Sequence, residues 1–543
     1  MASFRYIAAA FAALSLAVIS QAQTTAEKFG TMPETWDAEI SPDGKHLALG
    51  CSPTGVRAIC LYELDSDARP RLITPPEDGR IESVRWASGQ YLLYAVEVFD
   101  KVGTSSGLVD VNLRRLVAYD LKSSKSEMLM RNVGGFTSIT TVDSLLTDEN
   151  DRIMMNVSFR RDDTRVTGSR MDRGSNAGQH IIYKVNLKNG KARPDSSFAS
   201  EVFDTVHDAQ GNRLAEIERD FKTRSFKVYS TIDGRKLIFE REDAQMSPFF
   251  VDGLSQDKKS LIVSFDDGAR FGLYTLSLID GAIAPVIYQE SPVGYVGTID
   301  DPFTNEVIGY GYTDDLPGHV YLNEAFAEVQ TFTKNAIKAN RIILNSWTRD
   351  RKQFTLAAYN RGQPVQYYIY DTRVPSISPL GGEAPWLTSA DLGQVETVSY
   401  AARDGLEIEA FLTYPAGKTK ADAPLPLVML PHGGPEARDR ATYDWLAQAI
   451  ASQGYLVMQP NFRGSAGYGA EFRNAGYGEF GGKMIEDITD GAAWAVSQGL
   501  AKPGYCSVGW SYGGYAALMT GLKDAENAKC LISINGVTDV NMV

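Results

Sequence analysis

A strand–turn–strand unit recurs along the first two thirds of this 543-residue chain and limits the folds open to it. The clearest copy spans residues 38–49, where Pro42-Asp43-Gly44 separates two strand-like runs. Proline presets φ and glycine accepts a positive φ, so this tripeptide closes a hairpin. Weaker copies of the turn begin at Trp86, Thr147, His207, Leu254, Asp301 and Trp347.

Seven units of roughly 40–60 residues predict a β-propeller, because propeller blades are four-stranded sheets of about that length. A β-sandwich with accidental turn similarity is the alternative, but sandwiches rarely run this long. No long helical pattern is evident in residues 38–381. We therefore expect a propeller over residues 23–385, with seven as the expected number of blades.

The pattern changes over residues 386–543, where continuous apolar runs alternate with amphipathic segments. A hairpin is expected at its start. Strands are expected over residues 395–401, 406–414, 425–430, 455–459, 505–509 and 529–534, and helices over about 440–453, 484–498 and 515–522. Apolar strands separated by helices indicate a parallel sheet covered on both faces.

A serine lies at the turn between one of these strands and the following helix. The run Gly509-Trp510-Ser511-Tyr512-Gly513 matches G-x-S-x-G, the turn that exposes the nucleophile of an α/β-hydrolase. Small residues at both ends let this strained turn form without Cβ clashes. An incidental glycine–serine turn is the alternative, but the strand and helix on either side favour Ser511 as a nucleophile.

A glycine-rich run follows the strand at 425–430. The α/β-hydrolase fold places a donor of its oxyanion hole in this loop, so Gly433 and Gly434 are candidates. The backbone N–H of Tyr512 is the other expected donor. His432 lies in the same loop instead of after a later strand, so we expect it to support the loop and not to act as a general base.

Three motifs in this order carry a family resemblance: residues 432–435, residues 461–469 and residues 509–515. The chain resembles the prolyl oligopeptidase family of serine peptidases, nearest its bacterial dipeptidyl peptidase and acylaminoacyl peptidase branch. The resemblance implies a propeller that caps the active site and admits only short peptides. It also implies Ser511 as the acyl-forming nucleophile, Tyr512 and the Gly433 region as the oxyanion hole, and Arg463 in a structural loop beside the site.

The chain departs from this family after its last expected strand. Family members continue with two strand-and-helix units that bear the catalytic aspartate and histidine. Here the five histidines are His46, His180, His207, His319 and His432, and all precede Ser511. We therefore expect an α/β-hydrolase domain truncated after its sixth strand, without the catalytic Asp and His, and inactive alone.

The leading interpretation is thus an exported serine peptidase that cleaves short peptides through an acyl-enzyme on Ser511. Two alternatives stay open. One is an esterase, because the serine turn does not choose amides over esters. The other is a catalytically dead propeller-hydrolase that binds peptides or a partner protein. The oligomeric state also stays open.

The N-terminus reads as a secretory signal. Arg5 supplies a positive charge, residues 7–19 form a short apolar core, and Ser20-Gln21-Ala22 resembles a cleavage site. We expect removal of residues 1–22, export, most simply to a periplasm, and no membrane attachment afterwards. The net charge of −13 argues against a nucleic-acid partner. We expect no cofactor and no metal site, because no His/Cys group has ligand spacing.

Export permits disulfides between the four cysteines. Cys51 and Cys60 flank a turn-like stretch, and a tight turn would leave them out of register, so a bridge requires a wider loop. Cys506 and Cys530 lie in strands that could be neighbours, and we expect them to be buried free thiols. A polar insertion at residues 160–180 is expected to be a solvated loop, with binding of a peptide terminus as the alternative.

Overall fold

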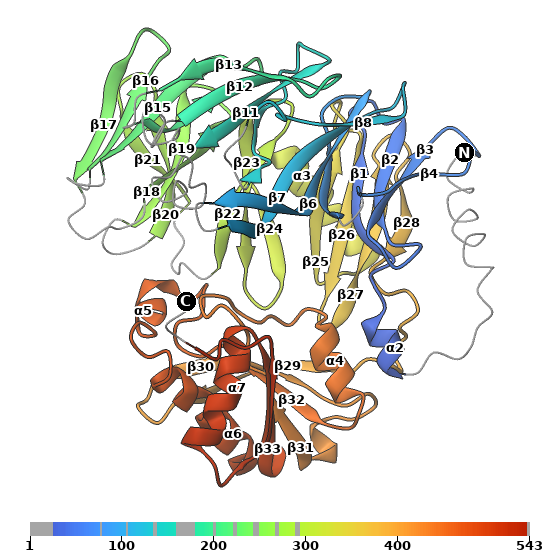
Figure 1. The fold of residues 1–543 in the computed structure, drawn as a ribbon, viewed down its shortest axis with the longest axis vertical. Coiled ribbons are helices and arrows are strands. Elements are labelled where there is room, and N and C mark those ends of the chain that lie inside the picture. The colour runs from blue at the N-terminus through green and yellow to red at the C-terminus, as the bar shows by residue number, and fades with distance from the viewer. Residues whose placement is uncertain are drawn as a thin grey trace.

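The propeller predicted from the repeated turns is present in the computed structural model, above the α/β-hydrolase domain in Figure 1. The structure describes residues 25–76, 79–104, 107–133, 138–158, 180–198, 202–220, 225–242, 249–266, 271–287 and 294–539. The expected signal peptide at residues 1–22 and nearly all of the expected insertion at 160–180 lie outside these residues.

The strands of each blade pair antiparallel in chain order, which confirms seven blades. Blades one to three contain β1 (Thr35–Ile40), β2 (His46–Cys51), β3 (Ala58–Glu63), β4 (Arg71–Ile73); β5 (Gly79–Trp86), β6 (Tyr91–Thr104), β7 (Gly107–Asp120), β8 (Lys125–Met128); and β10 (Val142–Ser144), β11 (Arg152–Ser158), β12 (His180–Asn186), β13 (Ala192–Ser197). Blades four and five contain β14 (Val202–His207), β15 (Arg213–Asp220), β16 (Ser225–Ser230), β17 (Lys236–Glu242); and β18 (Phe249–Leu254), β19 (Ser260–Asp266), β20 (Phe271–Ser277), β21 (Ile283–Ile287). Blades six and seven contain β22 (Tyr295–Asp301), β23 (Glu306–Thr313), β24 (Pro317–Tyr321); and β25 (Arg341–Trp347), β26 (Gln353–Asn360), β27 (Gln363–Asp371), β28 (Ser376–Gly382), while β9 (Ser138–Ile139) pairs with β7.

The repeated turn has a common chemistry. Ser41 Oγ donates to Asp43 Oδ1 at 2.7 Å, and Gly44 takes a φ of 70°. Thr348 and Asp350 repeat the hydroxyl–carboxylate bond at 2.6 Å in the seventh blade. The side chains of the turn therefore satisfy its own polar groups, which explains why the repeat is visible in the sequence.

The first and last blades close the ring through side chains, because their described strands belong to separate sheets. The N–H of Ile40 donates to Ser346 Oγ at 2.8 Å, and Asn345 Nδ2 donates to the Ala38 carbonyl at 2.6 Å. Apolar residues of both blades pack beneath these bonds: Ala38, Ile40, Leu47, Leu49, Ala357, Tyr367, Ile369 and Leu380. The ring therefore depends on contacts between residues about 300 positions apart in the sequence.

A central cavity of about 620 Å³ is lined by the first strands of all seven blades. Every residue that lines it belongs to the propeller, so the cavity is separate from the turn that carries Ser511. Its lining contains the carboxylates of Glu39, Asp143, Asp204, Asp252 and Asp300.

A helix that the sequence reading did not predict follows the third strand of blade six. Helix α3 (Glu324–Ile337) packs its Phe326 against Tyr321, Trp347 and Phe354, at ring-centre distances of 4.8–5.8 Å. This aromatic cluster fills the space between blades six and seven. The expectation of a propeller half without a long helix was wrong at this point.

The hydrolase domain contains a six-stranded sheet in the order β29-β30-β32-β31-β33-β34. Its elements are β29 (Val395–Ala401), β30 (Glu407–Thr413), the 3₁₀ helix η2 (Lys420–Asp422), β31 (Leu425–Met429), α4 (Trp445–Ala451), β32 (Leu456–Pro460), α5 (Gly469–Asn474), α6 (Lys483–Ser497), β33 (Ala501–Trp510), α7 (Tyr512–Lys523) and β34 (Ala528–Ile534). The hairpin β29–β30 is antiparallel, whereas β31, β32, β33 and β34 pair in parallel. The six expected strands and three expected helices are present in the expected order, although α4 is shorter than the expected 440–453 and the short helices η2 and α5 were not predicted.

The N-terminal helix α2 (Thr25–Gly30) lies beside α4 of the hydrolase domain and not among the blades (Figure 1). Lys28 pairs with Asp391 at 2.5 Å, and its carbonyl accepts from Trp386 Nε1 at 2.7 Å. The predicted boundary at residues 385 and 386 falls in the connection between β28 and β29. In the part of the chain that is described, no helix is long and apolar enough to cross a membrane.

Both cysteine pairs form disulfides, and the expectation of free thiols at Cys506 and Cys530 was wrong. These two residues are direct partners on the parallel strands β33 and β34, with Cα atoms 4.5 Å apart. Cys51 instead pairs with Ala58 across β2 and β3, and the wider loop brings Cys60 within 5.9 Å. Sequence position alone did not give the register that decides either bridge.

We predict that the protein contains no free thiol. Protein unfolded in urea should not react with a thiol reagent such as Ellman's reagent, and should show all four thiols after reduction. Reaction of two thiols before reduction would contradict the Cys506–Cys530 bridge, and peptide mapping would identify the pair.

Candidate active site

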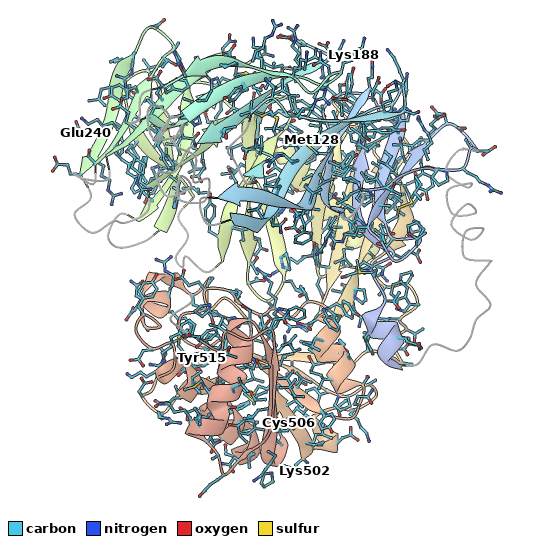
Figure 2. All side chains as sticks on the ribbon, in the orientation of Figure 1. Met128, Lys188, Glu240, Lys502, Cys506 and Tyr515 are labelled. Carbon is cyan, nitrogen blue, oxygen red and sulfur yellow. A yellow bond between two sulfur atoms is a disulfide. The ribbon has the colours of Figure 1, made fainter. Side chains whose placement is uncertain are left out.

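Ser511 forms the turn between β33 and α7 with a strained backbone. Its φ is 57° and its ψ is −121°, a conformation that costs a non-glycine residue about 1–3 kcal/mol. The turn is held because the N–H of Ser511 donates to Ile534 at 3.0 Å and its carbonyl accepts from Gly514 at 3.0 Å. Its hydroxyl has no hydrogen-bond partner among the described residues. In Figure 2, Lys502, Cys506 and Tyr515 lie successively closer to the propeller.

Two glycines make this turn possible, because backbone atoms occupy the space that a Cβ would need. A Cβ at Gly509 would lie 2.2 Å from the Gly513 carbonyl oxygen, and a Cβ at Gly513 would lie 2.1 Å from the Pro431 carbonyl oxygen. The second contact joins α7 to the loop after β31. The loop at residues 430–444, between β31 and α4, contains the expected oxyanion donors and is named the oxyanion loop. The serine turn and this loop therefore pack backbone against backbone.

The predicted oxyanion donors lie around Ser511. A Cβ placed on Gly433 would be 3.4 Å from Ser511 Cβ, so the two residues are neighbours. Within the described residues, the N–H groups of Gly433, Gly434 and Tyr512 have no acceptor. Tyr512 opens helix α7, whose N-terminal end favours negative charge. This arrangement can accept a developing oxyanion, and the assignment of these three residues stays a prediction.

His432 does not present a free nitrogen to Ser511. Its Nε2 lies 2.9 Å from Ser465 Oγ, and its Nδ1 lies 2.8 Å from the Gly433 carbonyl oxygen. The ring stacks on Phe462 at a centre distance of 4.4 Å, and burial lowers its pKa to about 4. The imidazole therefore connects the loop after β31 to the loop at residues 461–469, and its role in supporting an oxyanion hole stays a prediction.

Arg463 fixes that second loop through a buried ion pair. Its guanidinium donates to Asp487 Oδ1 at 2.6 Å and to Asp404 Oδ2 at 2.8 Å. The side chains of Arg463 and Asp487 are 5% and 0% exposed. These hydrogen bonds hold the pKa of Asp404 well below its usual range, whereas burial raises the pKa of Asp487. The predicted structural role of this loop thus has a physical basis.

A neighbouring polar cluster escaped the sequence reading. Arg438 Nη2 donates to Glu409 Oε1 and to Tyr468 Oη, both at 3.0 Å, and Asn461 Nδ2 donates to the same hydroxyl at 2.6 Å. These residues come from β30, the oxyanion loop and the loop after β32. Only Asn461 and Tyr468 lie in a motif that the sequence reading used.

No group of three or more His, Cys, Asp or Glu side chains in the described ranges could hold a metal ion.

We predict that Gly513→Ala disrupts both the serine turn and the oxyanion loop. The new Cβ meets a backbone oxygen at 2.1 Å, so the backbone must move. Thermal unfolding should show a lower Tm, and labelling of Ser511 by an active-site probe should fall. Gly30→Ala is the control, because its Cβ would meet nothing within 4 Å. Equal behaviour of the two variants would contradict the packing described above.

We also predict that Arg463→Met lowers the free energy of unfolding by about 3–5 kcal/mol, because Asp487 would remain as an unpaired buried charge. Arg403→Met is the control, because the Arg403–Asp490 pair is partly exposed and should contribute about 0–1 kcal/mol. Denaturant unfolding measures both effects. Similar small losses would show that the Arg463 pair does not hold the loop.

Comparison with known proteins shows similarity to serine peptidases. The family model described as "Prolyl oligopeptidase family" matches residues 441–543. Dipeptidyl aminopeptidase BIII of Pseudoxanthomonas mexicana is 29% identical over 527 residues, which cover 94% of this chain and 71% of that protein.

Two solved structures share the fold. A puromycin-hydrolyzing peptidase of Mycobacterium tuberculosis superposes with a TM-score of 0.62 at 16% identity, over 96% of this chain and 80% of the other. Prolyl oligopeptidase B of Galerina marginata superposes with a TM-score of 0.65 at 13% identity, over 98% and 77%. At these identities the structures support the propeller–hydrolase fold. Residues 441–543 match the model of the prolyl oligopeptidase family, and the chain as a whole is similar to a dipeptidyl aminopeptidase.

Proposed function

We propose that this protein is an exported serine peptidase that cleaves short peptides through an acyl-enzyme on Ser511. The observation that carries the proposal is the strained backbone of Ser511, which lies at the start of α7 and next to Gly433, with a hydroxyl that bonds to none of the described residues. Strain of this kind persists where the surrounding structure enforces it, and it is concentrated at functional sites.

The proposed reaction follows from the groups around the serine. Ser511 Oγ attacks the peptide carbonyl, and its proton passes to water, because no histidine nitrogen of the described residues is free beside it. The carbonyl oxygen becomes an anion that accepts from the N–H of Tyr512 and from Gly433 or Gly434. The C–N bond then breaks, the amine leaves with a proton, and water later hydrolyses the ester on Ser511.

The described residues include the proposed nucleophile and the proposed donors, but among them no free histidine nitrogen lies beside Ser511. His432 is the one histidine of the hydrolase half, and its two nitrogens are engaged elsewhere. A serine hydroxyl without a base stays protonated and is a weak nucleophile. We therefore propose that these 543 residues alone react slowly, near the roughly 10³–10⁴-fold enhancement over water that an oxyanion hole and binding provide.

Two observations support short peptides as the proposed substrates: the propeller above the hydrolase domain, and the similarity to a dipeptidyl aminopeptidase. The propeller lies above the hydrolase domain that carries the serine turn, and we propose that it limits access of large polypeptides (Figure 2). The relative aligned along most of the chain is a dipeptidyl aminopeptidase, which favours peptides with a free N-terminus as the substrates to test first.

Export to an oxidising compartment is part of the proposal. It is supported by the signal-like residues 1–22 and by the two disulfides, which persist in secreted proteins. A periplasm is the compartment that we propose.

We predict that a fluorophosphonate probe labels Ser511 slowly in this chain and not at all in the Ser511→Ala variant. Mass spectrometry of the adduct identifies the residue, and the labelling rate reports how well it is activated. Rapid labelling would contradict the proposed lack of a base. Labelling that persists in Ser511→Ala would contradict the assignment of Ser511 as the nucleophile.

The substrate side is tested with matched dipeptidyl p-nitroanilides and p-nitrophenyl esters, each with a free or an acetylated N-terminus. Preference for free-amine anilides supports a dipeptidyl peptidase. Turnover of esters alone would indicate an esterase, and peptide binding without labelling would indicate a catalytically dead binding protein.

A further inference from the structure

Arg438 lies where the oxyanion loop meets the propeller. Its side chain is only 4% exposed, although arginine is normally a surface residue. The guanidinium donates to Glu409 and Tyr468 within the hydrolase domain and lies 4.4 Å from the centre of the Tyr468 ring. It therefore uses charge, hydrogen bonds and ring stacking at once, which a lysine cannot reproduce.

The same guanidinium also reaches across to blade six. Its Nη1 donates to the Thr313 carbonyl at 3.4 Å, at the end of β23. Three residues along the chain, the N–H of Ala441 donates to the Asp315 carbonyl at 2.8 Å. The segment that leaves the oxyanion loop is thus hydrogen-bonded to the β23–β24 loop at two points.

The backbone on both sides of Arg438 is tied down as well. The carbonyl of Ala437 accepts from Ala466 at 2.9 Å, and the N–H of Asp439 donates to Asn461 Oδ1 at 2.7 Å. Both bonds reach the loop that also contacts His432 through Ser465. Movement of Arg438 would therefore be transmitted to the loop that carries Gly433.

The β23–β24 loop, which Arg438 and Ala441 contact, is itself held by hydrogen bonds and an ion pair. Asp315 pairs with Arg361 of blade seven and accepts from Thr397 Oγ1 of β29 at 3.0 Å. Arg361 also donates to Thr397 at 2.7 Å. The β23–β24 loop is therefore fixed to two blades and to the hydrolase sheet before it meets Arg438.

We propose that Arg438 is a positioning residue that couples docking of the propeller to the geometry of the oxyanion loop. Resting on the proposed function, the proposal makes blade six part of the support of the active site. An oxyanion donor has to lie within a few tenths of an ångström of its place, and a misplacement of about 1 Å can reduce a rate about 100-fold. If Arg438 only held the two domains together, its replacement would lower the free energy of unfolding and leave the reaction rate of Ser511 unchanged.

The first test needs no catalytic activity. Hydrogen exchange is followed in the full chain at the amides of Ala437, Asp439, Ala441 and Ala466, each of which donates a hydrogen bond in this junction. Arg438→Met should speed exchange at these amides. Arg361→Met, made in the propeller, should speed exchange at Ala441. The control is Arg373→Met, which removes a pair with Asp371 elsewhere on blade seven. Unchanged exchange in Arg438→Met, or the same change in the control, would overturn the proposal.

The second test asks whether Arg438 positions the oxyanion loop or only holds the two domains together. Inactivation by a dipeptidyl phosphonate gives a maximal rate and an apparent binding constant. Arg438→Met should lower the maximal rate about 10- to 100-fold and change the binding constant less than about threefold, with partial recovery in Arg438→Lys. An unchanged maximal rate in a reactive protein would overturn the proposal. If the wild-type chain does not react at Ser511 although exchange responds as expected, the proposed function fails and the structural coupling stands.

Discussion

The packing of two backbone segments without side chains between them is the constraint on which the site depends. A Cβ on Gly513 would lie 2.1 Å from the Pro431 carbonyl oxygen, so this position cannot carry one without displacement of backbone. A Cβ on Gly433 would lie 3.1 Å from the Trp510 carbonyl oxygen, which is a tight contact with the serine turn. These contacts bring the loop after β31 against the start of α7. The strain at Ser511 is tolerated because both neighbouring segments are fixed.

The surroundings of the site explain how those segments stay in place. His432 and Arg463 join the oxyanion loop and the loop at residues 461–469 to the body of the hydrolase domain. Arg438 joins the same region to blade six. The propeller therefore does more than cover the hydrolase domain, because it also accepts hydrogen bonds from the loop that contains the expected oxyanion donors. The central cavity of the blades is a separate feature that lies entirely within the propeller.

Much of this architecture could be predicted because its causes are local. The Pro42-Asp43-Gly44 turn satisfies its own polar groups, so its weaker copies were visible and the seven blades followed from them. The serine turn was equally clear, because small residues at 509 and 513 and the adjoining strand and helix are all contiguous in the sequence. Helix α3 could have been found, since Phe326, Thr333 and Ile337 recur at helical spacing and line one face. The strand periodicity of the neighbouring blades obscured it.

Other features could not be predicted because they depend on residues far apart in the sequence. The bridge between Cys506 and Cys530 requires the register of β33 and β34, which no local pattern specifies. Burial of Arg438 requires Glu409, Tyr468 and Thr313, which come from three separate segments. The environment of His432 likewise depends on Ser465, 33 residues away.

The central claim is that Ser511, Tyr512 and the Gly433–Gly434 backbone act on one substrate atom. The most direct measurement is a crystal structure of the protein with a phosphonate attached to Ser511 Oγ. We expect one phosphoryl oxygen about 2.7–3.1 Å from the N–H of Tyr512 and from that of Gly433 or Gly434. A phosphoryl oxygen turned toward solvent, with these N–H groups unpaired, would contradict it.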